Sequence, residues 1–230
     1  MRSNRAMAER PHHVVMVAFP NAQILDVTGP LEIFSRTSRW LADTWGRHAA
    51  AYEVEVVAAA PGPVPMSSGL ELNARRGFAE VTACDTLLVA GGIGWSTAAK
   101  DPALLAWLRA MAGRVERFGS VCTGALVLAA AGLLDGRRAT THWAYCDRLA
   151  ELAPGCCVEP DAIFVEDGRL FTSAGVTTGM DLALELVERD HGKATAVAVA
   201  QQLVIYRKRP GGQAQFSRYL EAEKRQDRLG

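Results

Sequence analysis

Cys122 stands between an apolar run at residues 118–121 and a string of small and apolar residues that begins with Thr123 and Gly124. This pattern predicts a strand that turns sharply into a helix, the setting in which a nucleophile is held at the turn. The start of a helix favours an anion through its dipole and free N–H groups, which predicts a lowered pKa for this thiol. The alternative is a small, buried structural cysteine.

The sequence Gly91-Gly92-Ile93-Gly94 follows a second apolar run at residues 86–90. Ligands of open parallel sheets bind at the carboxyl ends of strands, so we expect this loop to lie beside Cys122. Glycines leave backbone N–H groups open, which suits an oxyanion hole. A tight turn without such a role is the alternative, and the motif does not fit a dinucleotide-binding fingerprint.

Two further side chains are candidates for acid–base chemistry near Cys122. Asp26 follows the loop after the first predicted strand, and His142 follows a short predicted strand. Either side chain at the strand ends would be able to exchange a proton with the thiol. By spacing alone, Asp26 fits better as the N-cap of the next helix, and His142 beside Trp143 fits equally well as a structural residue.

The elements that must position these residues alternate between strands and helices. We expect buried strands at 13–19, 52–59, 86–90 and 118–121, a hairpin within 66–78, and shorter strands at 138–141, 158–159, 163–166 and 170–172. Helices are expected at 27–45, 102–114, 124–134, 144–152, 177–190 and 194–206. Continuously apolar strands between helices predict a three-layer α/β sandwich with a mostly parallel central sheet.

Composition and charge argue against several classes of protein. The chain has 230 residues, 49% of them hydrophobic, and a formal net charge of zero, which gives no support for direct nucleic-acid binding. Its five cysteines show no CxxC pair and no Cys/His metal spacing, so we expect free thiols, no metal and no cofactor. The first 11 residues lack the apolar region of a secretory signal and no apolar run is long enough to cross a bilayer, which predicts a cytoplasmic protein without membrane contact.

Residues 206–230 differ from the rest of the chain. They carry seven Lys or Arg side chains and three acidic ones, a net charge of +4 against −4 for the remainder. Their apolar content is too low for a core element. We therefore expect one domain at residues 12–206, followed by a basic linker or docking arm at residues 207–230.

Three stretches together resemble the DJ-1/PfpI superfamily, whose α/β fold is of the flavodoxin-like, class I glutamine amidotransferase-like type. They are FPNAQILDVTGPLEIFS, LLVAGGIG and SVCTGALVLAAAGLLDGRRATTHW. Two branches share the cysteine turn. One is isonitrile hydratase, and similarity to it implies Cys122 as the nucleophile, Asp26 as its proton-transfer partner and Thr123 as a neighbour of the site. The other comprises AraC/GlxA-like transcriptional regulators.

The second half of the chain is similar to the regulator branch, including RKRPGGQAQFS, which resembles the junction before its helix-turn-helix domain. This resemblance implies a non-enzymatic sensing domain that forms a homodimer. It also implies a small-molecule ligand near Gly91, Gly92, Ile93 and His142, and DNA binding only through a C-terminal domain absent from this chain. Thr123 replaces the histidine that follows the cysteine in PfpI-type proteases, so peptidase and glutaminase activities are not expected.

Overall fold

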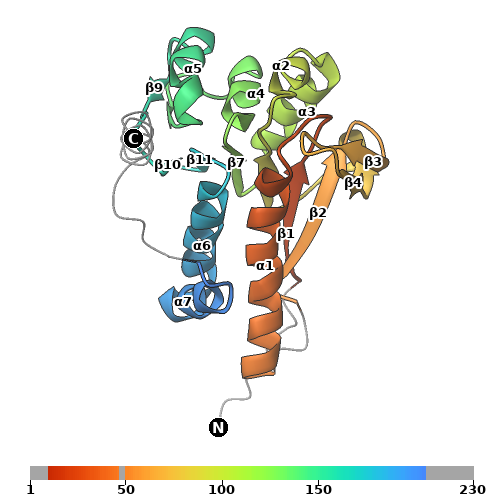
Figure 1. The fold of residues 1–230 in the computed structure, drawn as a ribbon, viewed down its shortest axis with the longest axis vertical. Coiled ribbons are helices and arrows are strands. Elements are labelled where there is room, and N and C mark those ends of the chain that lie inside the picture. The colour runs from red at the N-terminus through yellow and green to blue at the C-terminus, as the bar shows by residue number, and fades with distance from the viewer. Residues whose placement is uncertain (1–9, 47–49, 206–230) are drawn as a thin grey trace, which may run out of the picture.

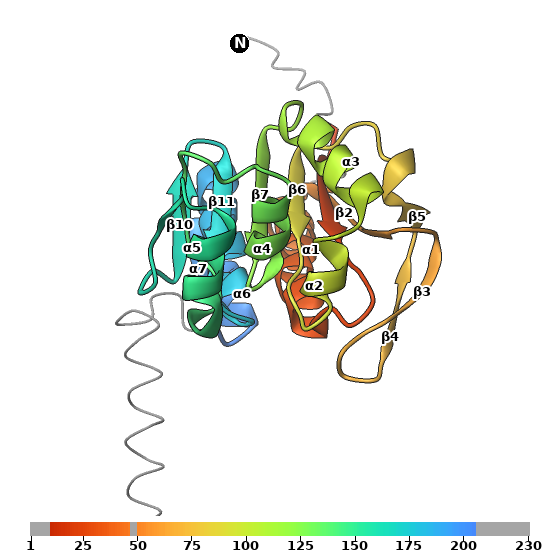
Figure 2. The same ribbon diagram turned by 90° about the horizontal axis from the view of Figure 1, so that it is seen from above.

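The computed structural model describes residues 10–46 and 50–205, which form a seven-stranded sheet with helices on both faces (Figures 1 and 2). Across the sheet the strands lie in the order β10 (Phe164–Asp167), β11 (Leu170–Ser173), β7 (Arg117–Val121), β6 (Thr86–Val89), β1 (His12–Val17), β2 (Tyr52–Ala58) and β5 (Arg76–Gly77). Every pairing in this sheet is parallel except that of β10 with β11. The predicted sandwich with a mostly parallel sheet is confirmed.

The helices divide between the two faces of the sheet (Figure 2). One face carries α1 (Ile24–Trp45), α6 (Thr178–His191) and α7 (Lys193–Gln202), which contact one another. The other carries α2 (Trp95–Ala98), α3 (Pro102–Ala112), α4 (Gly124–Ala130) and α5 (Cys146–Leu152). Helices on both faces leave the central strands without a solvent side, which explains their uninterrupted apolar sequences. Residues 14–17 of β1, for example, have no exposed surface.

Several element boundaries differ from those predicted, for local reasons. The helix predicted at 124–134 ends at Ala130, because Gly132 adopts a left-handed conformation with φ +71°. The helix predicted to end at residue 206 stops at Gln202, shortly before Val204, whose φ is +54°. Residues 143–145 form a 3₁₀ turn, η2 (Trp143–Tyr145), so the helix predicted from residue 144 starts at Cys146.

Two predicted strand segments lie outside the main sheet. A hairpin forms from β3 (Gly62–Pro65) and β4 (Glu71–Ala74), so its first strand lies before the predicted range of 66–78. Both strands extend beyond the edge of the main sheet (Figure 2). The strand predicted at 138–141 reduces to β8 (Arg138–Ala139), which pairs with β9 (Cys157–Val158) in a separate two-stranded sheet. A short 3₁₀ helix, η1 (Phe78–Glu80), follows β5. The predicted linker at 207–230 lies outside the described residues.

Candidate functional site

Three adjacent strands place the candidate site residues at one edge of the sheet. β7, β6 and β1 are neighbours and run parallel, so their carboxyl ends meet at the same edge. Cys122 follows β7, the Gly91–Gly92 loop follows β6, and α1 with Asp26 follows the loop after β1. The predicted convergence of these segments is therefore present in the structure.

Cys122 occupies a sharp turn between β7 and α4. Its φ is +54°, a conformation that costs a residue with a side chain roughly 1 kcal/mol or more. Two hydrogen bonds hold the turn, from the Cys122 N–H to the Ser173 carbonyl (2.9 Å) and from the Thr141 hydroxyl to the Cys122 carbonyl (2.9 Å). A cysteine held by its neighbours in a strained conformation fits the predicted strand–turn–helix motif.

Asp26 is fully buried and lies in the first turn of α1, which begins three residues earlier than predicted. Its Oδ2 accepts a hydrogen bond from the Gly91 N–H (3.0 Å), and its carboxyl group also contacts the Cys122 thiol. The N-cap position belongs to Gln23. The interpretation of Asp26 as a helix cap is therefore wrong, because its side chain points across to the β6 loop and the cysteine.

Burial dominates the electrostatics of this pair. It raises the pKa of Asp26 to about 7, although the hydrogen bonds from Gly91 and Cys122 oppose the shift. Burial also raises the pKa of Cys122, and the neighbouring Asp26 charge adds to that effect. The predicted lowering of the thiol pKa by the helix start is wrong for this resting state. Cys122 is a neutral thiol whose proton lies beside a carboxyl group that titrates near neutral pH.

Thr123 ties the cysteine turn to the glycine loop. Its hydroxyl accepts a hydrogen bond from the Gly92 N–H (2.8 Å) and donates one to the Gly92 carbonyl (3.1 Å). Gly91 also has no room for a side chain, because a Cβ there would lie 2.6 Å from both Asp26 Oδ2 and the Thr123 nitrogen. The N–H groups of Gly91 and Gly92 are thus both engaged within the protein. The interpretation of them as oxyanion donors is wrong.

Replacement of Thr123 tests the contribution of this double hydrogen bond. We expect Thr123→Val to lower the free energy of unfolding by about 1 kcal/mol, because it leaves the half-buried Gly92 N–H without a protein partner, whereas the Gly92 carbonyl keeps its bond from the Trp95 N–H (3.2 Å). Thr123→Ser retains the hydroxyl and is the matched control. Urea denaturation measures both, and equal losses in the two variants would contradict the role given to the hydroxyl.

A cleft of about 200 Å³ opens over this turn. Among its lining residues are five predicted site residues: Gly92, Ile93, Cys122, Thr123 and His142. The remaining lining residues, which sequence reasoning missed, are Gln23, Ser67, Tyr145 and Val176. Gln23 stands in the quoted loop before Asp26, whereas Ser67 and Val176 come from segments that carry no motif. Asp26 and Gly91 lie behind the cleft, on the buried side of Cys122.

His142 has a structural partner of its own. Its Nδ1 accepts a hydrogen bond from the Ala144 N–H (3.3 Å) at the start of η2, and its ring packs against Trp143 and Tyr145. Burial lowers its pKa, so the imidazole is neutral at neutral pH. Within the described part of the chain, no hydrogen bond joins His142 to Cys122. His142 therefore lines the cleft as a neutral ring and is not paired with the thiol.

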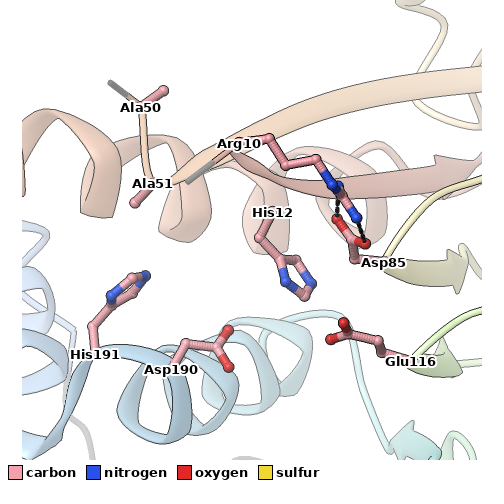
Figure 3. Close-up of a pocket in the computed structure, with 8 residues that line it drawn as sticks. All are labelled: Arg10, His12, Ala50, Ala51, Asp85, Glu116, Asp190 and His191. Carbon is pink, nitrogen blue, oxygen red and sulfur yellow. Dashed lines mark hydrogen bonds and ion pairs between the residues drawn. The ribbon is translucent and has the colours of Figure 1, made fainter. Parts of the chain in front are cut away.

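A polar pocket of about 380 Å³ lies at the opposite end of the sheet (Figure 3). There, His12 Nε2 lies 2.8 Å from the Thr86 hydroxyl and 2.9 Å from an Arg117 guanidinium nitrogen. Arg117 also pairs with Asp190 at the end of α6 (2.9 Å), and the Tyr52 hydroxyl donates to the same carboxylate (2.6 Å). Because a guanidinium only donates, His12 Nε2 must accept, and the ring is neutral.

This arrangement predicts that acid destabilises the fold through His12. Burial and then the Arg117 charge lower its pKa, against weaker opposing effects of Asp190, Asp85 and Glu116. A lowered folded-state pKa contributes stability above the ordinary histidine pKa of 6.5, and that stability is lost as pH falls through the folded-state pKa. Urea denaturation at pH 7.5 and 5.5 should show a larger loss for the wild type than for His12→Gln. Equal losses of stability in the two proteins would show that folding does not change the pKa of His12.

The described part of the chain offers neither a metal cluster nor a membrane span. Among residues 10–46 and 50–205, no group of three or more His, Cys, Asp or Glu side chains is placed to hold a metal ion. No helix within these ranges is long and apolar enough to span a membrane. All five cysteines are unpaired thiols in the structure.

Comparison with known proteins identifies the family that this chain matches. Residues 12–189 match the model of the DJ-1/PfpI family. Isonitrile hydratase of Pseudomonas putida is 40% identical over 185 residues, which cover 80% of this chain and 75% of that enzyme. The HTH-type transcriptional regulator CdhR of Pseudomonas aeruginosa is 40% identical over 163 residues, 71% of this chain but only 48% of the regulator. The chain thus spans about half the length of that regulator.

Solved structures agree with this assignment. A ThiJ/PfpI family protein from Pseudomonas syringae superimposes with a TM-score of 0.75 at 28% identity, over 90% of this chain and 80% of that one. The sequence-based resemblance to the superfamily, with relatives in both the enzyme and the regulator branch, is therefore confirmed.

Proposed function

The chain belongs to the DJ-1/PfpI family, and from this we propose that it acts as the ligand-sensing and dimerising N-terminal domain of an AraC-family transcriptional regulator. The observation that carries the proposal is the cleft at Cys122, which fits a small molecule, while the Gly91 and Gly92 N–H groups are already occupied. A resting neutral thiol beside such a cleft suits binding more than rapid nucleophilic attack.

In this proposal the ligand enters between Ile93, His142 and Tyr145 and reaches Cys122 at the floor of the cleft. Sensing requires that the ligand bind two states of the protein with different affinity. A homodimer with two-fold symmetry provides two such states through the relative orientation of its protomers. DNA is contacted by a further, C-terminal domain rather than by residues 12–206.

The mass of the native protein tests this proposal. An immunoblot against this domain, in cells that make the protein, should show a band about 10 kDa or more above 24.7 kDa, since a DNA-binding domain adds at least that mass. In a gel-shift assay, residues 1–230 alone should show no sequence-specific DNA binding. A native band at 24.7 kDa, or specific DNA binding by this chain, would contradict the proposal.

A second candidate is an isonitrile hydratase-like lyase, favoured by the contact between Asp26 and Cys122 and by the pKa of about 7 for Asp26. The Cys122 sulfur would add to the isonitrile carbon while its proton passes through Asp26 to the same carbon. Water would then displace the thiol, which regains its proton, and release the N-substituted formamide. A side chain that titrates near the working pH is well suited to such transfers.

Turnover separates the two candidates. The regulator proposal predicts that cyclohexyl isonitrile incubated with the wild-type protein yields no N-cyclohexylformamide above the level seen with Cys122→Ala. Formamide production that Cys122→Ala abolishes would establish the enzyme instead. The control variant Cys157→Ala alters an exposed cysteine away from the cleft and should match the wild type in either case.

A further inference from the structure

A second pocket, of about 200 Å³, lies beside the cysteine cleft but separate from it. It occupies the carboxyl ends of β1 and β2, between these strands and helices α2 and α3. Its lining residues are Val17, Ala18, Phe19, Pro20, Asn21, Ala59, Phe78, Gly94, Thr97, Ala98, Asp101 and Leu104. None of them lines the cysteine cleft. This is the edge of a parallel sheet at which ligands bind.

The floor of this pocket is apolar and its rim is open. Phe19, Phe78, Ala98 and Leu104 are each at most 6% exposed, so the floor belongs to the hydrophobic core. Residues at the rim, such as Thr97, are solvent-exposed. A small molecule therefore reaches an apolar floor without any separation of secondary-structure elements.

The charge of the pocket selects against ions. Asp101 is its only charged lining residue, and its Oδ1 accepts hydrogen bonds from the N–H groups of Ala103 (2.9 Å) and Leu104 (3.2 Å) as the N-cap of α3. A carboxylate at the rim repels an anion, and the positive end of the α3 dipole disfavours a cation there. An uncharged ligand avoids both penalties.

The wall between the pocket and the cleft is held rigidly by backbone hydrogen bonds. The Gly94 N–H donates to the Asn21 carbonyl (3.1 Å), and the Gln23 N–H donates to the Gly91 carbonyl (2.8 Å). Asn21 and Gly94 face the second pocket, whereas Gln23 faces the cleft. A pocket whose wall is already ordered loses little conformational entropy when a ligand binds.

We propose that this pocket is a second small-molecule site, which binds an uncharged ligand with a single aromatic ring or a branched aliphatic body. An apolar cavity of about 150 Å³ holds benzene, so the volume here accommodates one ring with a short substituent. The site does not depend on the chemistry of Cys122.

Calorimetric titration of the wild-type protein with benzyl alcohol tests the proposal, with benzoate and benzylammonium as charged probes of similar size. We expect benzyl alcohol to bind with a negative heat-capacity change and at least tenfold more tightly than either ion. Ala98→Leu fills the floor of the pocket and should abolish binding. Ala106→Leu, the same change at an exposed position of α3, is the matched control and should bind like the wild type.

Two results would overturn the proposal: no binding of benzyl alcohol by the wild type, or equal binding by Ala98→Leu. A second measurement keeps it testable if Ala98→Leu does not fold. Wild-type crystals under xenon pressure should show a xenon atom between Phe78 and Leu104, and xenon bound elsewhere only would also overturn it. Cys122→Ala should retain benzyl alcohol binding, so failure of the proposed sensing function leaves this test intact.

Discussion

Asp26→Asn should remove the pH dependence of stability that Asp26 imposes on the wild-type protein. Burial raises the pKa of this carboxyl group from 3.8 to about 7. A raised folded-state pKa contributes stability that is fully present below the unfolded value and is lost as pH rises through the folded value. Between pH 5 and pH 8 this contribution falls by roughly 2–3 kcal/mol, a large fraction of the stability of an ordinary domain.

Urea denaturation at pH 5, 6.5 and 8 measures this contribution. The difference in unfolding free energy between the wild type and Asp26→Asn should shift by roughly 2–3 kcal/mol in favour of the variant from pH 5 to pH 8. An asparagine oxygen still accepts from the Gly91 N–H, so the variant keeps that contact. Subtraction removes the opposite trend of His12, whose pKa is lowered by burial and by the Arg117 charge.

Cys122→Ser is the control for this experiment, because its hydroxyl donates to Asp26 as the thiol does and leaves the carboxyl group in place. Its pH profile should follow that of the wild type. A constant difference between the wild type and Asp26→Asn across this pH range would show that Asp26 ionises in the folded protein much as it does in the unfolded one.

The order of strands and helices was predictable because burial leaves a strong pattern. Residues 14–17 of β1 and 87–89 of β6 are apolar without interruption, as strand segments buried on both faces must be. The exchange of hydrogen bonds between Thr123 and Gly92 was not predictable, because nothing in the local sequence says which segments meet after the strands end. The same holds for Ser67 and Val176, which reach the cleft only through the fold.

The protonation states of the site were not predictable either. A helix start lowers a thiol pKa in isolation, but at Cys122 desolvation and the neighbouring carboxyl group outweigh it. The sequence shows that both residues are present but not how deeply they are buried, and burial decides the direction in which each pKa shifts. For Asp26 the sequence favoured a cap because a carboxyl near a helix start usually serves that purpose. The early start of α1 carries the side chain past the cap position.

Gly124→Ala should destabilise the protein by roughly 3 kcal/mol or more, although alanine is the better helix former by about 1 kcal/mol. A Cβ at this position would lie 2.3 Å from the Val89 carbonyl oxygen and 2.8 Å from that of Ala90. Both are backbone atoms at the end of β6, which pairs with β7 and β1 and has no freedom to withdraw. The start of α4 must therefore move away from β6.

Gly113→Ala is the matched control, because Gly113 has φ −75° and a Cβ there would meet only the Ala110 oxygen, at 3.8 Å. We expect it to be neutral or to stabilise by about 0.5 kcal/mol, through a smaller loss of chain entropy. Urea denaturation compares the two substitutions directly. If Gly124→Ala were as stable as Gly113→Ala, α4 would not pack against β6 as described. If the loss is as expected, the close approach of α4 to the end of β6 is what requires glycine at residue 124. The same approach holds Cys122 and Thr123 against Gly91 and Gly92.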